Sequence, residues 1–217
     1  MEKNRSGQFI ALLALIVAIV GVSVGFAAFS SALSIRSSAT VIPDKSTMNV
    51  DFSSSATSVV TDAIRATTTP EDLVATEATI DNSADPVIKN LGATFKEPGQ
   101  KAVYSFYAYN AGELVAYLKS IVYANVASET SNKVCKANEG TTDALVQKAC
   151  EGISLKVKVG TEAETSSGIA SINNHVLAKG NSDQVTVTLE YAANAERADG
   201  DFTVSFGDVT LNYSSVD

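Results

Sequence analysis

Four segments near the C-terminus alternate strictly between apolar and polar residues. In residues 153–159 (ISLKVKV) every second residue is aliphatic, and the residues between them are Ser or Lys. The same period of two recurs in residues 185–191, 202–206 and 209–213. This period is typical of strands with one buried face and one face in water. Strands of a parallel sheet are covered on both faces, so the alternation predicts an antiparallel sheet.

Other segments extend this β pattern toward the N-terminus. Residues 102–110 (AVYSFYAYN) follow the turn signal EPGQ at 97–100, and Gly112 separates them from a long apolar segment at 114–126. Weaker strand signals occur at 48–52 and 74–80. Residues 142–151 predict one short helix with Thr142 as its N-cap. Many strands and one helix predict a mainly β fold, an antiparallel jelly-roll-like β-sandwich with a short helical insertion.

The N-terminus carries a segment of a different kind, an uncharged and almost wholly apolar run at residues 9–29. A helix of this length spans about 30 Å, the thickness of a bilayer core. Lys3 and Arg5 precede the run, which favours a cytoplasmic N-terminus and an exported C-terminal part. The length favours a transmembrane anchor, whereas the small residues at its end favour a cleaved signal peptide. Both alternatives place the rest of the chain at the cell surface, membrane-anchored or secreted.

These signals divide the chain into three parts. Residues 1–29 are the signal peptide or membrane anchor, and the membrane is the partner of this N-terminal helix. Residues 30–47 are rich in Ser, Ala and Thr and predict an extended tether or donor strand. Residues 48–217 are predicted to form the extracellular β-sandwich domain.

The exported part is acidic. Without residues 1–29 the chain has 14 basic and 23 acidic residues, a net charge of −9. Such a surface repels nucleic-acid phosphates, so no nucleic-acid partner is expected. The chain contains no P-loop, dinucleotide fingerprint, GxSxG or HExxH motif. We therefore expect no enzymatic activity, no catalytic residues, no metal site and no cofactor.

The chain has two cysteines, Cys135 and Cys150. In an oxidising compartment outside the cell, the default state of such a pair is a disulfide. Free thiols are the alternative. A metal site would need more ligands, and the single histidine, His175, is distant in the sequence.

Two groups of residues suggest further sites, each with a plainer structural alternative. Asp199, Asp201 and Asp208 supply oxygen ligands of the kind that Ca²⁺ prefers, but the same Asp-Gly residues also suit hairpin turns. The second group is a set of tyrosines that suits either a sugar-binding platform or the core and rim of a sheet: Tyr104, Tyr107, Tyr109, Tyr117 and Tyr123.

Two regions of the sequence are similar to the TasA/camelysin family of Gram-positive surface and biofilm-fibre proteins. The first is GFAAFS at 25–30, which resembles the end of that family's signal peptide and implies cleavage between Ala28 and Phe29. The second runs from FKEPGQ at 95–100 to the NAG turn at 110–112. The resemblance implies a secreted jelly-roll subunit that assembles into fibres when an N-terminal strand, within residues 29–52, is donated to a neighbouring copy. This sequence differs from the family in three respects: its apolar run is longer, Phe26 stands where Trp is frequent, and it contains the cysteine segment.

The sequence thus favours an exported structural or adhesive protein of the cell surface, with self-assembly into filaments as an expectation. Two alternatives stay open. One is a type IV pilin-like subunit that uses the apolar helix for assembly, with a cut after Gly7, although Leu12 stands where bacterial pilins carry Glu. The other is a membrane-anchored carbohydrate-binding module based on the tyrosines.

Overall fold

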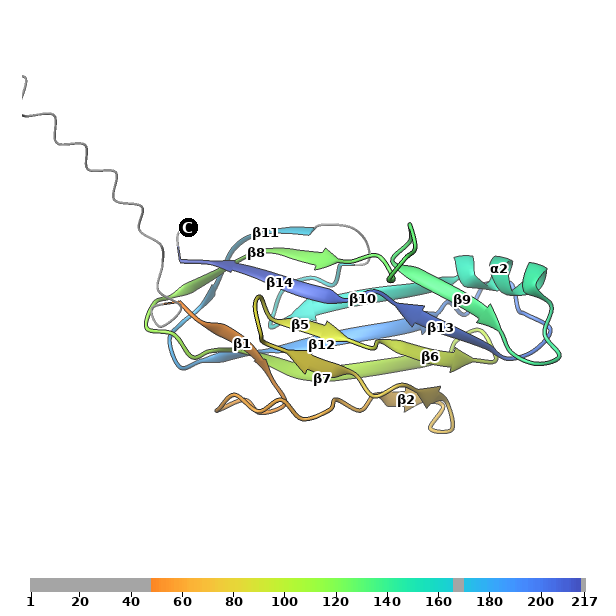
Figure 1. The fold of residues 1–217 in the computed structure, drawn as a ribbon, viewed down its shortest axis with the longest axis horizontal. Helices are drawn as coiled ribbons and strands as arrows, with labels where there is room; N and C mark the ends of the chain where they lie inside the picture. The colour runs from red at the N-terminus through yellow and green to blue at the C-terminus, as the bar shows by residue number, and fades with distance from the viewer. Residues whose placement is uncertain (1–47, 166–169, 216–217) are drawn as a thin grey trace, which may run out of the picture. The chain divides into compact units, whose positions relative to one another are not determined.

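A computed structural model describes residues 48–165 and 170–215 of the chain (Figure 1). The expected signal or anchor, the tether and the cleavage site at Ala28 and Phe29 lie outside these residues. The described elements are β1 (Val50–Ser53), β2 (Thr67–Thr69), β3 (Val74–Ala75), β4 (Thr79–Asp81), β5 (Val87–Lys89), β6 (Gly92–Phe95), β7 (Lys101–Asn110), β8 (Ala116–Tyr123), β9 (Lys133–Ala137), α2 (Asp143–Glu151), β10 (Ile153–Val159), β11 (Ala170–Leu177), β12 (Ser182–Tyr191), β13 (Phe202–Phe206) and β14 (Val209–Ser214).

The strands form three antiparallel sheets. The first has the order β1-β7-β12-β10, and β2 also pairs with β7, beyond the end of β1. The second has the order β11-β8-β14-β5-β4, and the third has the order β3-β6-β13-β9. Sequence-adjacent strands take equivalent places in the second and third sheets: β8 continues into β9, β5 into β6 and β13 into β14. These two sheets therefore behave as one bent layer that faces the first sheet.

The turn at Gly207 and Asp208, between β13 and β14, differs from the one expected from the sequence. Gly207 and Asp208 suggested a hairpin, but β13 and β14 belong to different sheets and do not pair. The chain instead passes close to the end of β8, where the Ala124 amide donates to the Asp208 carbonyl at 2.8 Å. A Cβ on Gly207 would lie 2.0 Å from the Ala124 carbonyl oxygen, so only glycine fits this crossing.

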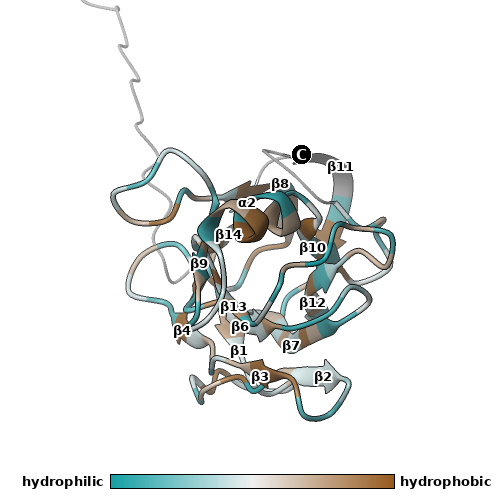
Figure 2. Ribbon diagram, turned by 90° about the vertical axis from the view of Figure 1, so that its right-hand side faces the viewer, coloured by the Kyte–Doolittle hydropathy of each residue, from teal (hydrophilic) through white to brown (hydrophobic). Residues whose placement is uncertain are grey.

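Aromatic side chains join the two layers. Tyr191 of the first sheet packs edge-to-face against Phe202 and Phe95 of the third, with ring centroids 5.6 and 5.9 Å apart. The hydroxyl of Tyr104 lies 2.9 Å from the carbonyl oxygens of both Thr76 and Gly92. All of these rings are fully buried. Viewed end-on, the strands enclose this interior, and α2 closes the side between β9 and β10 (Figure 2).

The sequence-based secondary structure is largely confirmed. Strands occupy the segments predicted at 102–110, 114–126, 153–159, 185–191, 202–206 and 209–213, and a helix occupies 143–151. The single strand expected at 74–80 is wrong, because β3 and β4 are separate strands in different sheets. Five strands were not predicted: β2, β5, β6, β9 and β11. The fold is mainly β with antiparallel pairing, as expected.

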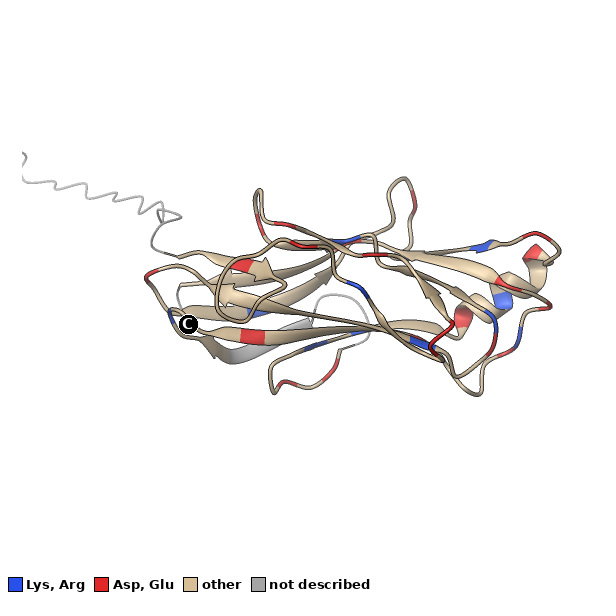
Figure 3. Ribbon diagram, turned by 90° about the horizontal axis from the view of Figure 1, so that it is seen from below, with Lys and Arg blue, Asp and Glu red and all other residues tan. Residues whose placement is uncertain are grey.

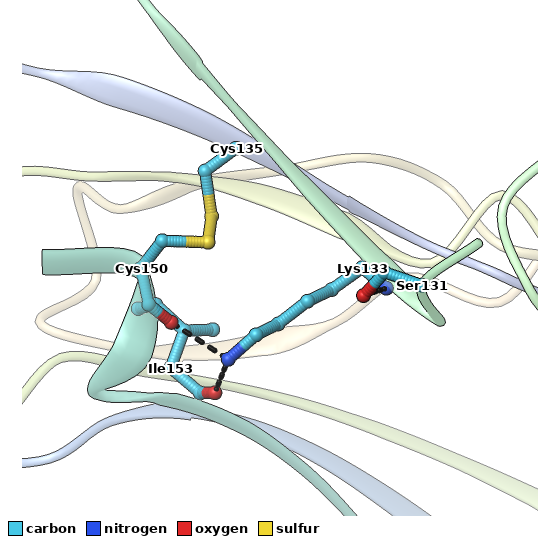
Figure 4. Close-up of a disulfide and its surroundings, with 5 residues drawn as sticks. All are labelled: Ser131, Lys133, Cys135, Cys150 and Ile153. Atoms are coloured by element: carbon cyan, nitrogen blue, oxygen red, sulfur yellow. Dashed lines mark hydrogen bonds between the residues drawn. A yellow bond between two sulfur atoms is a disulfide. The ribbon is translucent and has the colours of Figure 1, made fainter. Parts of the chain in front are cut away.

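The predicted disulfide between Cys135 and Cys150 is present and ties strand β9 to the last turn of α2 (Figure 4). Beside it, the Lys133 ammonium donates to the carbonyls of Cys150 at 2.6 Å and of Ile153 at 2.5 Å. A cation at a helix C-terminus satisfies carbonyls that have no partner within the helix. Burial lowers the pKa of Lys133, while Glu151 acts in the opposite direction. The disulfide and this lysine together hold α2 over the sheet edge.

The disulfide closes a loop of 15 residues. We predict that the double variant Cys135→Ala/Cys150→Ala loses about 3 kcal/mol of unfolding free energy, because the cross-link restricts the unfolded chain. Urea denaturation of residues 48–217 measures this loss. The wild-type protein in reductant is the control and should match the variant. An unchanged urea midpoint in both samples would contradict the prediction.

Candidate strand-docking edge

The chain enters the domain through a close backbone contact at Asn49. The Asn49 carbonyl accepts a hydrogen bond from the Gly112 amide at 3.0 Å. A Cβ on Gly112 would come within 2.4 Å of the Asn49 nitrogen, so a larger residue would push the incoming chain away. In the sequence, Gly112 was noted as a separator of two strands and as the last residue of the NAG turn. In the structure it fixes where the N-terminal segment meets the domain.

A buried asparagine holds the turn around Gly112 in place. The side-chain amide of Asn110 donates to the carbonyls of Leu114 at 2.8 Å and Leu177 at 2.9 Å, and its oxygen accepts from the Gly112 amide at 3.0 Å. Asn110 is fully buried, so these bonds have no competition from water. The turn is therefore a rigid support for the first residues of β1.

Strand β1 pairs with β7 on one side only and so lies at the edge of the first sheet. On its open side, the side chain of Asn82 covers the backbone of Phe52: the Phe52 amide donates to Asn82 Oδ1 at 3.0 Å, and Asn82 Nδ2 donates to the Phe52 carbonyl at 2.9 Å. Alternate residues of an antiparallel edge strand direct their N–H and C=O groups to the same side. The backbone N–H and C=O groups of Val50, two residues before Phe52, therefore face the open side as well.

A small pocket lies beside Val50, with a volume of about 230 Å³. Its lining comes from the start of β1, from the turn between β4 and β5 and from β14: Met48, Asn49, Val50, Ala84, Asp85, Pro86, Leu211 and Tyr213. Most of these side chains are apolar. Main-chain hydrogen-bonding groups thus lie next to an apolar pocket. An extended peptide can bind to such a combination as an additional strand of the sheet.

Tyr213 lines this pocket, but its hydroxyl lies on a buried side where no described residue accepts or donates a hydrogen bond to it. Burial raises the pKa of Tyr213 strongly, and the charge of Asp183 raises it further. The hydroxyl therefore stays protonated above the pH at which an ordinary tyrosine ionises. Tyr213 supplies an uncharged wall to the pocket.

The structure does not bring the five tyrosines of the expected sugar platform together. Tyr104 is buried in the core, and the Tyr123 hydroxyl forms hydrogen bonds with Thr165, in the segment after β10. Strand alternation places Tyr107 and Tyr109 on the outer face of the first sheet, and Tyr117 on the outer face of the second. The tyrosines are mainly parts of sheets, which was the plainer alternative.

The aspartates of the expected calcium site have separate roles. Asp199 accepts hydrogen bonds from the Thr142 amide at 3.0 Å and the Thr142 hydroxyl at 2.5 Å, and these bonds lower the pKa of Asp199. Thr142 is the N-cap residue of α2, as predicted, but its side chain makes no capping hydrogen bond with the helix and is held by Asp199 instead. Asp201 lies 4.0 Å from the Lys96 ammonium. Neither Asp199 nor Asp208 forms a hairpin turn. Across residues 48–165 and 170–215, no group of three or more His, Cys, Asp or Glu side chains is arranged to hold a metal ion.

Charged side chains are dispersed over the described domain, with Lys and Arg positions interspersed among Asp and Glu (Figure 3). Within the described part of the chain, no helix is long and apolar enough to cross a membrane. The run at 9–29, on which the anchor prediction depends, lies outside that part. Comparisons with protein-family models, curated proteins and solved structures found no match to this chain.

The contacts of Asn82 make a prediction about the β1 edge. Asn82→Ala removes both hydrogen bonds to Phe52 and should lower the unfolding free energy by about 1–3 kcal/mol, because an amide and a carbonyl lose their partner. Amide hydrogen exchange at Phe52 should accelerate at the same time. Asn125→Ala, which removes the same side chain at an exposed position after β8, is the control and should change neither quantity. Equal effects of the two substitutions would show that Asn82 does not protect the edge.

Proposed function

We propose that this chain is an exported structural protein of the cell surface whose domains assemble by strand exchange. In this proposal, part of residues 30–47 of one copy adds to the β1 edge of the next, within a jelly-roll-type sandwich. The single observation that carries the proposal is the position of the pocket: it lies beside Val50, at the open edge and at the point where the N-terminal segment enters the domain. The resemblance to the TasA/camelysin family supports the same function.

The size of the pocket supports a side chain as its occupant. Small-molecule sites usually measure roughly 300–1,000 Å³ and bury most of their ligand. A hole of about 230 Å³ at an open edge suits one or two apolar side chains of an added strand better. In residues 32–35 (ALSI), the large apolar Leu33 and Ile35 alternate with small residues, and residues 39–42 (ATVI) contain the apolar Val41 and Ile42. Both segments therefore contain candidate side chains for the pocket.

The length of the N-terminal segment is sufficient for an exchange between copies. Eighteen residues separate position 29 from position 48. Extended chain rises about 3.3 Å per residue, which gives a reach of about 60 Å. Residues 50–53 are not available as donor, since they already form β1 of their own domain. This narrows the donor expected within residues 29–52 to the part before Val50.

The fate of the apolar run decides which form assembles. N-terminal sequencing and intact mass of the native protein distinguish the forms: a start at Phe29 fits a released subunit, a start at Gln8 fits the pilin-like alternative, and Met1 fits a permanent anchor. We predict that residues 29–217 form filaments visible by electron microscopy, whereas residues 48–217 stay monomeric. Filaments formed equally well by both would contradict donation by the N-terminal segment.

A matched pair of substitutions tests the acceptor pocket. Ala84→Phe places a large side chain at the pocket wall and should abolish assembly of residues 29–217, because the incoming side chain loses its space. Ser83→Phe adds the same bulk on the neighbouring residue, which does not line the pocket. Thermal unfolding of residues 48–217 carrying each substitution checks that the fold survives. If both variants assemble like the wild type, β1 is not the acceptor edge.

A further inference from the structure

The chain's only histidine connects the two layers of the domain. The Nδ1 atom of His175 lies 2.8 Å from Glu162 Oε1, and its Nε2 atom lies 2.7 Å from Asp183 Oδ2. His175 belongs to β11 at the edge of the second sheet, Asp183 to β12 in the first sheet, and Glu162 to the turn after β10. The histidine side chain is 10% exposed.

Register and alternation show that this contact lies on the inner faces. His175 pairs with Leu118, which also pairs with Tyr213 on its other side, and Leu118 is fully buried. Asp183 has the same strand parity as the buried Val185 and Val187. A Cβ on Gly160 would lie 3.1 Å from Asp183 Oδ1 and 3.3 Å from His175 Cε1, and this glycine has a φ of +53°. The turn after β10 therefore leaves room for the contact.

Hydrogen-bond chemistry determines the charge of the ring. A neutral imidazole has one N–H donor and one bare nitrogen, whereas an imidazolium has two donors. Ionised carboxylates only accept, so two carboxylates at opposite nitrogens are both satisfied only by the imidazolium. Loss of a proton would leave a nitrogen lone pair against a carboxylate oxygen at less than 3 Å.

We infer that His175, Glu162 and Asp183 form a proton-dependent bridge that fastens the β11 edge to the first sheet and releases it when the ring loses a proton. The charged side chains that face the ring are Glu162 from the turn after β10 and Asp183 from β12, and the uncharged Tyr213 of β14 interacts with Asp183. The described contacts place no cation against the ring. The bridge would act as a pH-sensitive fastening of one sheet edge.

The direction of the pH dependence follows from the same contacts. Burial lowers the pKa of His175, but the hydrogen bonds with Asp183 and Glu162 outweigh it, so the pKa is raised above its ordinary value. A group whose pKa is higher in the folded than in the unfolded state stabilises the fold below its unfolded pKa. The stabilisation is lost as the pH rises through the folded-state pKa. The edge should therefore loosen on the alkaline side.

Because the chain has a single histidine, its ring can be observed without assignment. Full-length protein in detergent, labelled with ¹⁵N only in histidine, gives the protonation state of both ring nitrogens by NMR. At pH 7 a histidine of ordinary pKa is about one-quarter protonated. Because the pKa of His175 is raised, we expect a larger protonated fraction than this at the same pH. Glu162→Gln and Asp183→Asn should each move the titration to lower pH, while the control Glu164→Gln, on an exposed neighbour, should not.

Hydrogen–deuterium exchange tests the release of the edge. Protection factors of the β11 amides should fall severalfold as the ring titrates, and those of β7 in the centre of the first sheet should not. His175→Gln should remove this pH dependence. The proposal is wrong if the ring titrates at or below the value of a free histidine, if neither carboxylate variant shifts it, or if β11 protection stays constant across the titration. The wild-type NMR and exchange measurements decide the matter even if His175→Gln does not fold.

Discussion

The fold depends on burying the inner face of the first sheet against a layer that is made of two shorter sheets. Tyr191 contacts Phe95 and Phe202 across the interior, and Tyr104 reaches the carbonyls of Thr76 and Gly92. Buried aromatic rings contribute large apolar areas and prefer edge-to-face geometry, so these contacts both stabilise the layers and fix their alignment. The edges, the pocket and the histidine bridge all take their positions from this alignment.

The alternation in the sequence was sufficient to predict the strands with a clear period of two and the face that each of them buries. It could not predict which strands pair, because a period of two contains no information about the neighbour. Residues 202–206 and 209–213 were therefore interpreted as a hairpin, although they belong to different sheets. Strand β9 escaped prediction because its sequence, KVCKA, does not alternate with a period of two. The disulfide was predictable, since two cysteines in a chain that is expected to be exported leave few alternatives.

Much less of the candidate site could be predicted from the sequence. Asn82 contacts Phe52 across 30 residues, and His175 meets carboxylates 13 and 8 residues away. None of these spacings is a motif, because the partners meet only through the sheet order. The glycines were the one available signal: Gly112, Gly160 and Gly207 each stand where another side chain would collide with a neighbouring segment. Their positions mark close approaches, but the sequence does not say what approaches.

The edges of the two layers are closed by three different kinds of chemistry, and this difference has a consequence for assembly. Beside the start of β10, α2 is fixed by a covalent bond and by Lys133. Beside the end of β10, β11 is fastened by the ionic bridge of His175, whose strength depends on pH. The β1 edge has only the neutral amide of Asn82, which covers Phe52 but not Val50. An unpaired edge recruits another strand unless something blocks it. Of these three edges, the one with the weakest fastening lies next to the N-terminal segment, and the proposed strand exchange places its acceptor there.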